Sequence, residues 1–504
     1  MTIPHHDWIA HHAAYAPESL AQVDLHSGRR FTYRQMHERV QRLASFLRNQ
    51  CGVRKGDRVA TLCHNSTDGF EILFAAQRAG AIELPLNWRL AVPELEFILK
   101  DAEPVALIYS EEFAPQVEAL RGRLSIPHLI LKREGEPSDY EAAIDAGIDP
   151  FEPEAATLDD VWMLIYTSGT TGRPKGAQLT YGNHFFNDVN AAMKAELTVR
   201  SHCLVYLPLF HVGGICVYAI PLFHFGGTVT VMRQFDAARA LALLADPASG
   251  ITHAFGVPTN FLFMSQLPAF ADARFDHLVT VGVGGAPSPL ALLELCASKG
   301  MPLTQAWGMT ETATLGTFLS KEMALAKIGS SGQPVLHAAL RIVDGEGTDV
   351  GAGVVGELLI KGPTITPGYW RREEVNKVAL ADGWLRTGDA AYVDADGYYF
   401  IVDRWKDMFI SGGENVYPAE VEDAIYRLEG VGECAVIGVA DERWGQVGRA
   451  FVVVKPGAAL DEAGVLGHCL ANLARYKVPK SVRFVAELPH NATGKILKHE
   501  LPRD

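Results

Sequence analysis

A run of glycine and hydroxyl-bearing residues between positions 166 and 176 could do chemistry. It reads Tyr-Thr-Ser-Gly-Thr-Thr-Gly-Arg-Pro-Lys-Gly and follows the apolar stretch Trp162–Ile165, which is typical of a buried strand. Glycines let backbone amides turn toward an anion, while hydroxyls and a lysine add donors and positive charge. The pattern predicts a loop that closes around the phosphates of ATP. The candidate phosphate ligands are Thr167, Ser168, Gly169, Thr170, Thr171, Gly172 and Lys175.

Spacing excludes two other nucleotide-binding loops. A Walker loop needs a glycine, four residues, and then Gly-Lys-Ser/Thr, but Gly169 and Lys175 are separated differently and Pro174 precedes the lysine. The segment from Gly282 starts like a dinucleotide fingerprint but ends in Pro287 instead of a third glycine. The loop at 166–176 is therefore of another kind.

Four further residues are candidates for contact with a nucleotide. The hydroxyl of Thr310 beside the carboxylate of Glu311 suits a phosphate oxygen and a magnesium ion, although this pair could also be a strand end with a helix cap. The carboxylate of Asp389 can accept hydrogen bonds from both ribose hydroxyls, but a lone aspartate is usually a turn residue. Lys495, near the C-terminus, is by base rate a solvated surface charge.

Length and composition limit the class of protein. A chain of 504 residues is too long for one compact core, so at least two domains are expected. A formal net charge of -14 argues against nucleic-acid binding. Seven cysteines without a Cys-x-x-Cys pair argue against a disulfide framework or a zinc site and favour the reducing cytoplasm. No signal peptide is expected.

The segment between Arg200 and Arg233 contains no Asp, Glu, Lys or Arg and could be mistaken for a membrane span. Prolines and glycines such as Pro208, Pro221 and Gly226 interrupt it. We therefore predict a core β-α-β unit with one buried helix and no transmembrane segment.

Short Val-, Ile- and Leu-rich runs alternate with longer segments of helical spacing, which predicts an α/β fold. The pattern changes near Gly383, where a hairpin with its turn at Asp394–Gly397 is expected. We predict a large N-terminal domain, residues 1–404, with parallel and mixed sheets and helices. A small mobile C-terminal α+β domain, residues 405–504, should follow.

The pattern Tyr-Thr-Ser-Gly-Thr-Thr-Gly-x-Pro-Lys-Gly resembles the AMP-forming adenylate superfamily. The resemblance extends from Phe31 to Lys495 and is closest to bacterial fatty-acyl-CoA ligases. It implies an ATP-dependent acid–CoA ligase. A carboxylic acid and ATP with magnesium would give an acyl-adenylate and pyrophosphate. Coenzyme A would then take the acyl group and release AMP.

The resemblance also implies roles for individual residues. Thr310 would touch the α-phosphate, Glu311 would hold magnesium, and Lys495 would bridge the substrate carboxylate and the α-phosphate. Asp389, assisted by Arg404, would hold the ribose. Trp307 replaces the usual tyrosine, so stacking on adenine could survive but a tyrosine hydroxyl contact could not. The other expected nucleotide contacts are Gly285, Ala286, Pro287, Gln305, Ala306, Gly308 and Met309.

The same resemblance makes Lys406 the hinge and places a coenzyme A tunnel at Ser411, Gly412 and Gly413. The expected acyl pocket is mainly apolar, which favours a medium- or long-chain fatty acid or an aromatic acid. His211 could gate this pocket or could equally be a packed core histidine. The expected pocket residues are His211, Val212, Gly213, Phe255, Val257, Met309 and Leu315.

Two other functions stay open at this point. A stand-alone amino-acid or aryl-acid adenylating enzyme would use the same loop, but His211 follows Phe210 where amino-acid enzymes usually place an aspartate. A non-catalytic adenylate-binding protein could keep the fold, although Thr310, Glu311 and Lys495 are all present. A homodimer is also left open.

Overall fold

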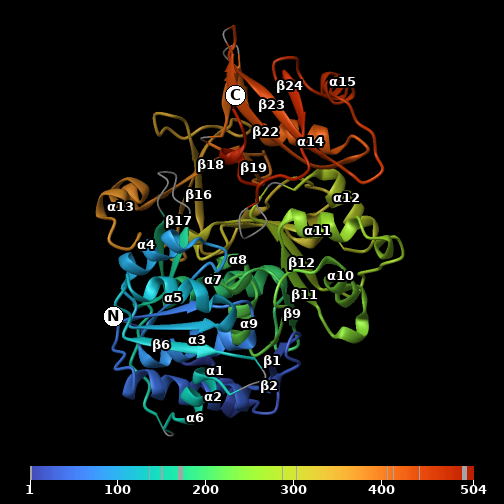
Figure 1. Ribbon diagram of the computed structural model, residues 1–504. Coiled ribbons are helices and arrows are strands. Elements are labelled where there is room, and N and C mark those ends of the chain that lie inside the picture. Colours follow the sequence, from blue (N-terminus) through green and yellow to red (C-terminus); the bar gives the residue numbers. More distant parts are fainter. Residues whose placement is uncertain are drawn as a thin grey trace.

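The computed structural model describes residues 3–134, 137–148, 151–167, 174–286, 288–301, 303–405, 407–411, 414–441, 443–490 and 496–503. For Arg404, Glu414 and Asn415 it describes the backbone only. Figure 1 shows the two large sheets and their helices in one part of the molecule, with strands β22, β23 and β24 at the opposite end.

One large sheet has the strand order β6-β5-β3-β4-β7-β8 and is parallel except at the β7–β8 pair. Its strands are short and largely buried, as expected for a sheet covered on both faces. They are β3 (Arg58–Leu62), β4 (Ile82–Pro85), β5 (Ala106–Ser110), β6 (His128–Lys132), β7 (Val161–Thr167) and β8 (Lys175–Thr180).

The other large sheet has the order β15-β14-β13-β12-β11-β9-β10-β1-β2 and is parallel from β1 to β13, with antiparallel strands at both edges. Its strands are β1 (Leu20–Asp24), β2 (Arg30–Thr32), β9 (His202–Val205), β10 (Thr228–Val231), β11 (His253–Gly256), β12 (Thr280–Gly284), β13 (Leu303–Trp307), β14 (Thr317–Phe318) and β15 (Gln333–Pro334).

Two smaller sheets follow along the chain, in the orders β16-β17-β18-β19 and β21-β20-β23-β22, with β24 paired to β23. Their strands are β16 (Ala339–Val343), β17 (Gly356–Lys361), β18 (Leu385–Val393), β19 (Tyr399–Arg404), β20 (Phe409–Ser411), β21 (Glu414–Val416), β22 (Val431–Asp441), β23 (Gly445–Val454) and β24 (Ser481–Phe484).

Helices cover the sheets, and the main core cluster draws side chains from both large sheets and from helices α3, α7 and α9. Capping boxes at Thr32 and Thr180 fix where α2 and α7 begin. The helices are α1 (Trp8–Tyr15), α2 (Tyr33–Asn49), α3 (Thr67–Ala79), α4 (Val92–Ala102), α5 (Ala114–Arg121), α6 (Asp139–Asp145), α7 (Tyr181–Ala195), α8 (Val212–Ile215), α9 (Ala219–Phe225), α10 (Ala237–Ala245), α11 (Pro258–Ser265), α12 (Leu290–Ser298), α13 (Glu373–Ala379), α14 (Pro418–Tyr426) and α15 (Glu462–Asn472).

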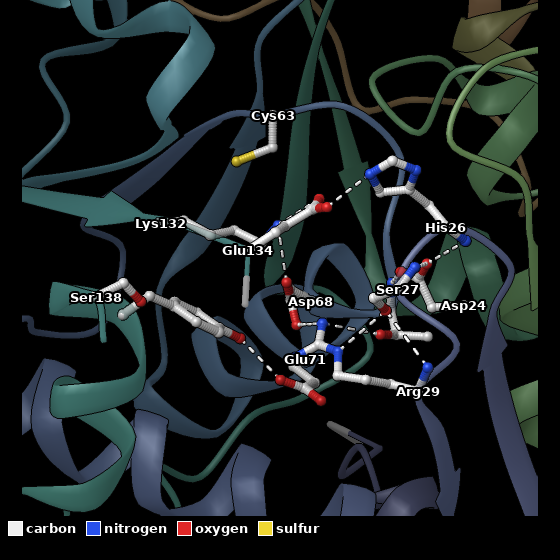
Figure 2. A network of polar contacts seen from close by, with 12 residues as sticks. Asp24, His26, Ser27, Arg29, Cys63, Asp68, Glu71, Lys132, Glu134 and Ser138 are labelled. Carbon is white, nitrogen blue, oxygen red and sulfur yellow. Dashed lines mark hydrogen bonds and ion pairs between the residues drawn. The ribbon is translucent and has the colours of Figure 1, made fainter. Parts of the chain in front are cut away.

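A buried ionic network joins the two large sheets (Figure 2). Lys132 on β6 lies 2.9 Å from the Asp68 carboxylate on α3, which also pairs with Arg29 from the loop before β2. Burial alone would raise the pKa of Asp68, but Lys132 and Arg29 outweigh it and lower that pKa. The Tyr140 hydroxyl donates to Glu71 at 2.9 Å in the same network. These contacts are structural and lie outside the predicted site.

The α/β fold with a large N-terminal and a smaller C-terminal unit is confirmed. The segment between Arg200 and Arg233 forms β9 and β10 as predicted, but two short helices, α8 and α9, replace the single expected helix. α8 begins after the cap residue His211, and α9 begins at Ala219, directly after Tyr218. Within the described ranges, no helix has both the length and the apolar character needed to cross a membrane.

The hairpin at 385–404 is also confirmed as β18 and β19. Asp394 builds its turn, because its carboxylate accepts hydrogen bonds from the amides of Asp396 and Tyr398, both at 2.9 Å. β19 ends at Arg404 and β20 begins at Phe409. The exact division at 404/405 stays a prediction.

Glu83, on β4, is a buried carboxyl group whose ionisation should affect the stability of the core. Its side chain is buried, accepts a hydrogen bond from Thr61 at 2.8 Å, and has its pKa raised by burial from 4.5 to about 8. The folded state therefore binds this proton more tightly than the unfolded state, and stability falls as pH rises from about 4.5 to about 8. Glu83→Gln should remove that loss. The difference between the thermal midpoints of this variant and of wild type should therefore increase as the pH rises through this window. Substitution of an exposed residue, Glu429→Gln, should give no such pH-dependent difference.

Candidate active site

The glycine- and hydroxyl-rich segment connects β7 and β8. These strands pair antiparallel with Thr167 opposite Lys175, and the Thr167 hydroxyl donates to the Lys175 carbonyl at 3.5 Å. Ser168, Gly169, Thr170, Thr171 and Gly172 lie outside the described residues, so their phosphate contacts stay predictions. The hairpin fixes both ends of the predicted loop.

Residues 366–370 pair with β8 along its outer edge. The amide of Trp370 donates to the Gly176 carbonyl at 2.7 Å. This pairing places Tyr369 beside Lys175, whose ammonium nitrogen lies 5.5 Å from the centre of the tyrosine ring. A cation at that distance over an aromatic face is attracted to it.

Gly368 permits this arrangement. Its φ of +143° is rarely adopted by other residues, and an added Cβ would lie 2.6 Å from the Asn376 amide nitrogen. Asn376 in turn accepts from the Tyr369 amide at 2.7 Å and donates to the Tyr369 carbonyl at 3.0 Å. The backbone of Tyr369 is therefore fixed on both sides.

The Tyr369 hydroxyl donates to a carboxylate oxygen of Glu311 at 2.6 Å. Glu311 is buried in the short 3-10 turn Thr310–Thr312 that follows β13, and its carbonyl accepts from the amide of Thr366 at 2.8 Å. Tyr369 thus contacts the predicted metal-binding carboxylate and the predicted phosphate-binding lysine. Sequence reasoning missed Tyr369, because an aromatic residue after a glycine is no specific signal.

Trp307 and Asp389 also meet. The indole N–H donates to a carboxylate oxygen of Asp389 at 2.8 Å, and both side chains are buried. Gly316 leaves room for the indole, since an added Cβ would lie 2.3 Å from the ring. The predicted adenine-stacking and ribose-binding residues are therefore neighbours that orient one another. Arg404 lies opposite Asp389 in the β18–β19 pair.

The predicted turn after β12 lies beside the end of β13, because Gly284 pairs with Ala306. Gly285 has a φ of +80°, which suits a tight turn. The Gln305 side chain donates to the Ser330 carbonyl at 2.8 Å. Gly308 packs so closely on the backbone that a Cβ would meet the Thr314 carbonyl at 1.5 Å. Pro287 lies outside the described residues.

Two predicted acyl-pocket residues, Gly213 and Phe255, line a cavity of about 10 Å³. His211 accepts a hydrogen bond from the Gly213 amide at 3.0 Å, so it caps α8. The remaining predicted pocket residues do not line this small cavity, and their role in acyl binding stays a prediction. Val212 and Leu315 lie in the main core, Met309 packs against the β16–β19 sheet, and Val257 lies beside Gly285.

Lys406, Gly412, Gly413 and Lys495 lie outside the described residues, and their roles stay predictions. Ser411 ends β20 and is buried.

Lys498, just beyond Lys495, contacts Glu422 at 2.8 Å and Asp403 at 3.9 Å. Burial lowers the pKa of Lys498, but these carboxylates outweigh burial and raise it overall. The C-terminal tail is thereby attached to α14 and to the end of β19.

Comparisons with known proteins identify the family. Residues 9–370 match the model of the AMP-binding enzyme family, and residues 420–495 match its C-terminal domain. The chain belongs to the AMP-binding enzyme family.

It is 42% identical over 496 residues to a feruloyl-CoA synthase of Amycolatopsis, with 98% of each chain covered. It is 37% identical over 489 residues to a long-chain-fatty-acid–CoA ligase of Mycobacterium tuberculosis, with 96% of this chain and 95% of the relative covered.

Among solved structures, it resembles o-succinylbenzoate CoA synthetase of Bacillus subtilis bound to its acyl-adenylate. The TM-score is 0.88 at 30% identity, with 99% of this chain and 98% of the other covered. The same enzyme has been solved with ATP and a magnesium ion, at a TM-score of 0.87 and 30% identity, covering 99% of this chain and 100% of the other.

The side chains at this site are suited to bind a magnesium ion together with ATP. Magnesium prefers oxygen ligands and is usually held by one or two carboxylates together with substrate phosphates. Glu311 offers one buried carboxylate whose orientation Tyr369 fixes. Bound there, the ion would neutralise phosphate charge.

Tyr369→Phe should lower the apparent affinity of the enzyme for magnesium. It removes a hydrogen bond to the Glu311 carboxylate, and such bonds contribute about 1.5–3 kcal/mol. We expect the magnesium concentration for half-maximal turnover to rise roughly tenfold to a hundredfold. A titration of activity against magnesium at fixed ATP measures this.

Tyr140→Phe is the matched control, because it removes a buried tyrosine–glutamate bond far from the site. It should lower thermal stability without changing the magnesium titration. An unchanged titration for Tyr369→Phe would contradict the positioning role.

Proposed function

We propose that the protein is an AMP-forming acid–CoA ligase whose reaction takes place where β8, the 310–312 turn and segment 366–370 meet. The observation that carries this is the contact of Tyr369 with both Lys175 and Glu311. A phosphate-binding lysine and a magnesium-binding carboxylate at one sheet edge suit attack on the α-phosphate of ATP.

The chemistry has two steps. The substrate carboxylate attacks the α-phosphate, which gives an acyl-adenylate and releases pyrophosphate. The thiol of coenzyme A then attacks the acyl carbonyl and releases AMP. Thr310 contacts the α-phosphate, while Asp389 and Trp307 hold the nucleoside. No nucleophilic side chain is needed, because the mixed anhydride is itself activated.

The two steps need different groups at one phosphate. Lys495 serves the first, and its ammonium group stabilises charge on the five-coordinate phosphorus. Ser411, Gly412 and Gly413 line the coenzyme A path in the second. The domain of residues 405–504 rotates about Lys406 between the steps.

The substrate is a fatty or aromatic carboxylic acid. The predicted pocket residues are mainly apolar, and no charged residue lines the small cavity beside Gly213 and Phe255. The names of the relatives support both kinds of acid, since one is a feruloyl-CoA synthase and another a long-chain-fatty-acid–CoA ligase. The free cysteines support a reducing location such as the cytoplasm. A homodimer stays a prediction.

A screen of acids tests this function. Purified protein with ATP, magnesium and coenzyme A should release AMP with a C8–C18 fatty acid or an aromatic acid. Amino acids should give no AMP release. Nucleotide binding without pyrophosphate release for any acid would instead favour a non-catalytic protein. Pyrophosphate exchange without a coenzyme A product would favour a stand-alone adenylating enzyme.

Lys495→Ala should separate the two steps. One transition-state contact contributes about 3–4 kcal/mol, so adenylation should fall roughly 10²–10³-fold. Thioester formation from supplied acyl-adenylate should stay near the wild-type rate. The control, Lys455→Ala, removes an exposed lysine of the same domain and should affect neither step. Equal losses in both steps would refute the role of Lys495.

A further inference from the structure

Asp101, in the last turn of α4, contacts two separate parts of the chain. Its carboxylate accepts a hydrogen bond from the Tyr166 hydroxyl at 2.6 Å and pairs with the Arg372 guanidinium at 2.8 Å. Only 13% of the Asp101 side chain is exposed. Its backbone carbonyl accepts hydrogen bonds from the Trp370 indole N–H and from the Arg371 guanidinium, both at 3.2 Å. One residue thus holds both the end of β7 and the chain that leads into α13.

The contact with β7 reaches the predicted phosphate loop. Tyr166 is the first residue of the glycine- and hydroxyl-rich run, and it pairs with Gly176, the last residue of that run, across the β7–β8 hairpin. The Tyr166 ring lies against Gly176, since an added Cβ there would lie 3.0 Å from a ring carbon. Burial and the hydrogen bond to Asp101 both raise the pKa of Tyr166, so its hydroxyl stays a donor. Both ends of the predicted loop therefore meet at this ring, whose hydroxyl Asp101 holds.

The chain before α13 is strained where Asp101 holds it. Arg371 has a φ of +51°, in the left-handed region that few residues other than glycine adopt. Such a backbone persists only where its surroundings fix it. Asp101 contacts Arg371 itself and both of its neighbours, Trp370 and Arg372. Directly before them lies Tyr369, which contacts the predicted phosphate-binding lysine and the predicted metal-binding carboxylate.

We propose that Asp101 is a positioning residue for ATP, and this rests on the proposed function. It sets the ends of the predicted phosphate loop against the segment that carries Tyr369. Without Asp101, that arrangement would have to form when the nucleotide binds, and ordering a loop at that moment lowers affinity. The effect should therefore fall on ATP and not on the acid or on coenzyme A. An ion pair with Arg372 alone would contribute little, so the contact with Tyr166 gives Asp101 this role.

Asp101→Asn and Tyr166→Phe test the proposal. The first variant removes the charge and keeps the shape of the side chain, and the second removes only the hydroxyl. Each weakens or removes the hydrogen bond between the tyrosine and the carboxylate. The dissociation constant of ATP with magnesium, and the KM for ATP in pyrophosphate release, should rise roughly tenfold to a hundredfold. The KM for the acid and the rate of thioester formation from supplied acyl-adenylate should stay near the wild-type values.

The double variant shows whether Asp101 acts through Tyr166. If it does, Asp101→Asn combined with Tyr166→Phe should bind ATP about as well as the more impaired single variant, because the two effects are not additive. Glu103→Gln is the matched control. Glu103 follows Asp101 by two residues and pairs with Arg371 at 2.6 Å, but its side chain is 60% exposed. Its substitution should leave ATP binding unchanged.

Two results would overturn the proposal. One is wild-type affinity for ATP in both single variants. The other is an equal loss in ATP binding, acid KM and thioester formation with a lower thermal midpoint, which would make Asp101 a structural residue only. Should Asp101→Asn fail to fold, Tyr166→Phe decides between these outcomes. Calorimetry measures ATP binding without any acid. A wild type that binds ATP but releases no pyrophosphate with any acid would therefore contradict the proposed function and not the role of Asp101 in ATP binding.

Discussion

The site depends on one hydrogen bond, from the Tyr369 hydroxyl to the Glu311 carboxylate at 2.6 Å. It joins segments that are far apart in the chain, because Glu311 follows β13 of one large sheet while Tyr369 is paired with β8 of the other. The Lys175 ammonium group also lies over the face of the Tyr369 ring. A single side chain thus sets both the lysine and the carboxylate that we propose to act on the ATP phosphates and their magnesium ion. Such preorganisation reduces the rearrangement needed when the nucleotide binds.

The fold supports that bond through backbone contacts instead of further charges. Asn183, at the start of α7, donates to the carbonyls of Pro363 and Ile365 at 2.8 and 2.9 Å. Asn376 fixes Tyr369 from the other side. Segment 363–370 is therefore attached to α7, β8 and the 310–312 turn together. A residue other than glycine at 368 would disturb the contact between Asn376 and Tyr369, because its Cβ would collide with the Asn376 amide.

Local patterns predicted the parts of the structure that depend on neighbouring residues. The alternation of apolar runs and helical segments predicted the sheets, and Asp394–Gly397 predicted the β18–β19 hairpin. The Trp307–Asp389 and Glu311–Tyr369 contacts could not be predicted this way, since they join residues 82 and 58 positions apart. The order of the strands in the sheets determines which of these distant residues meet. The roles of Ser168, Lys406, Gly413 and Lys495 stay predictions.

The attachment of the C-terminal tail bears on how one site could serve two steps. Lys498 and Glu422, 2.8 Å apart, both lie beyond the proposed hinge, so a rotation about Lys406 would carry them together. Asp403 lies before the hinge, and its 3.9 Å contact with Lys498 would change. The hydrogen bond from the Leu290 amide to Asp423, at 3.0 Å, also crosses the two parts and would break. The Ala419 amide also donates to Asp403 at 3.0 Å, so the rotation would have to break described contacts of Asp403 and Leu290, while the contact that holds the tail to its own domain would persist. Under the proposed mechanism, Lys495 would therefore leave the phosphate while its domain keeps the contact between Lys498 and Glu422.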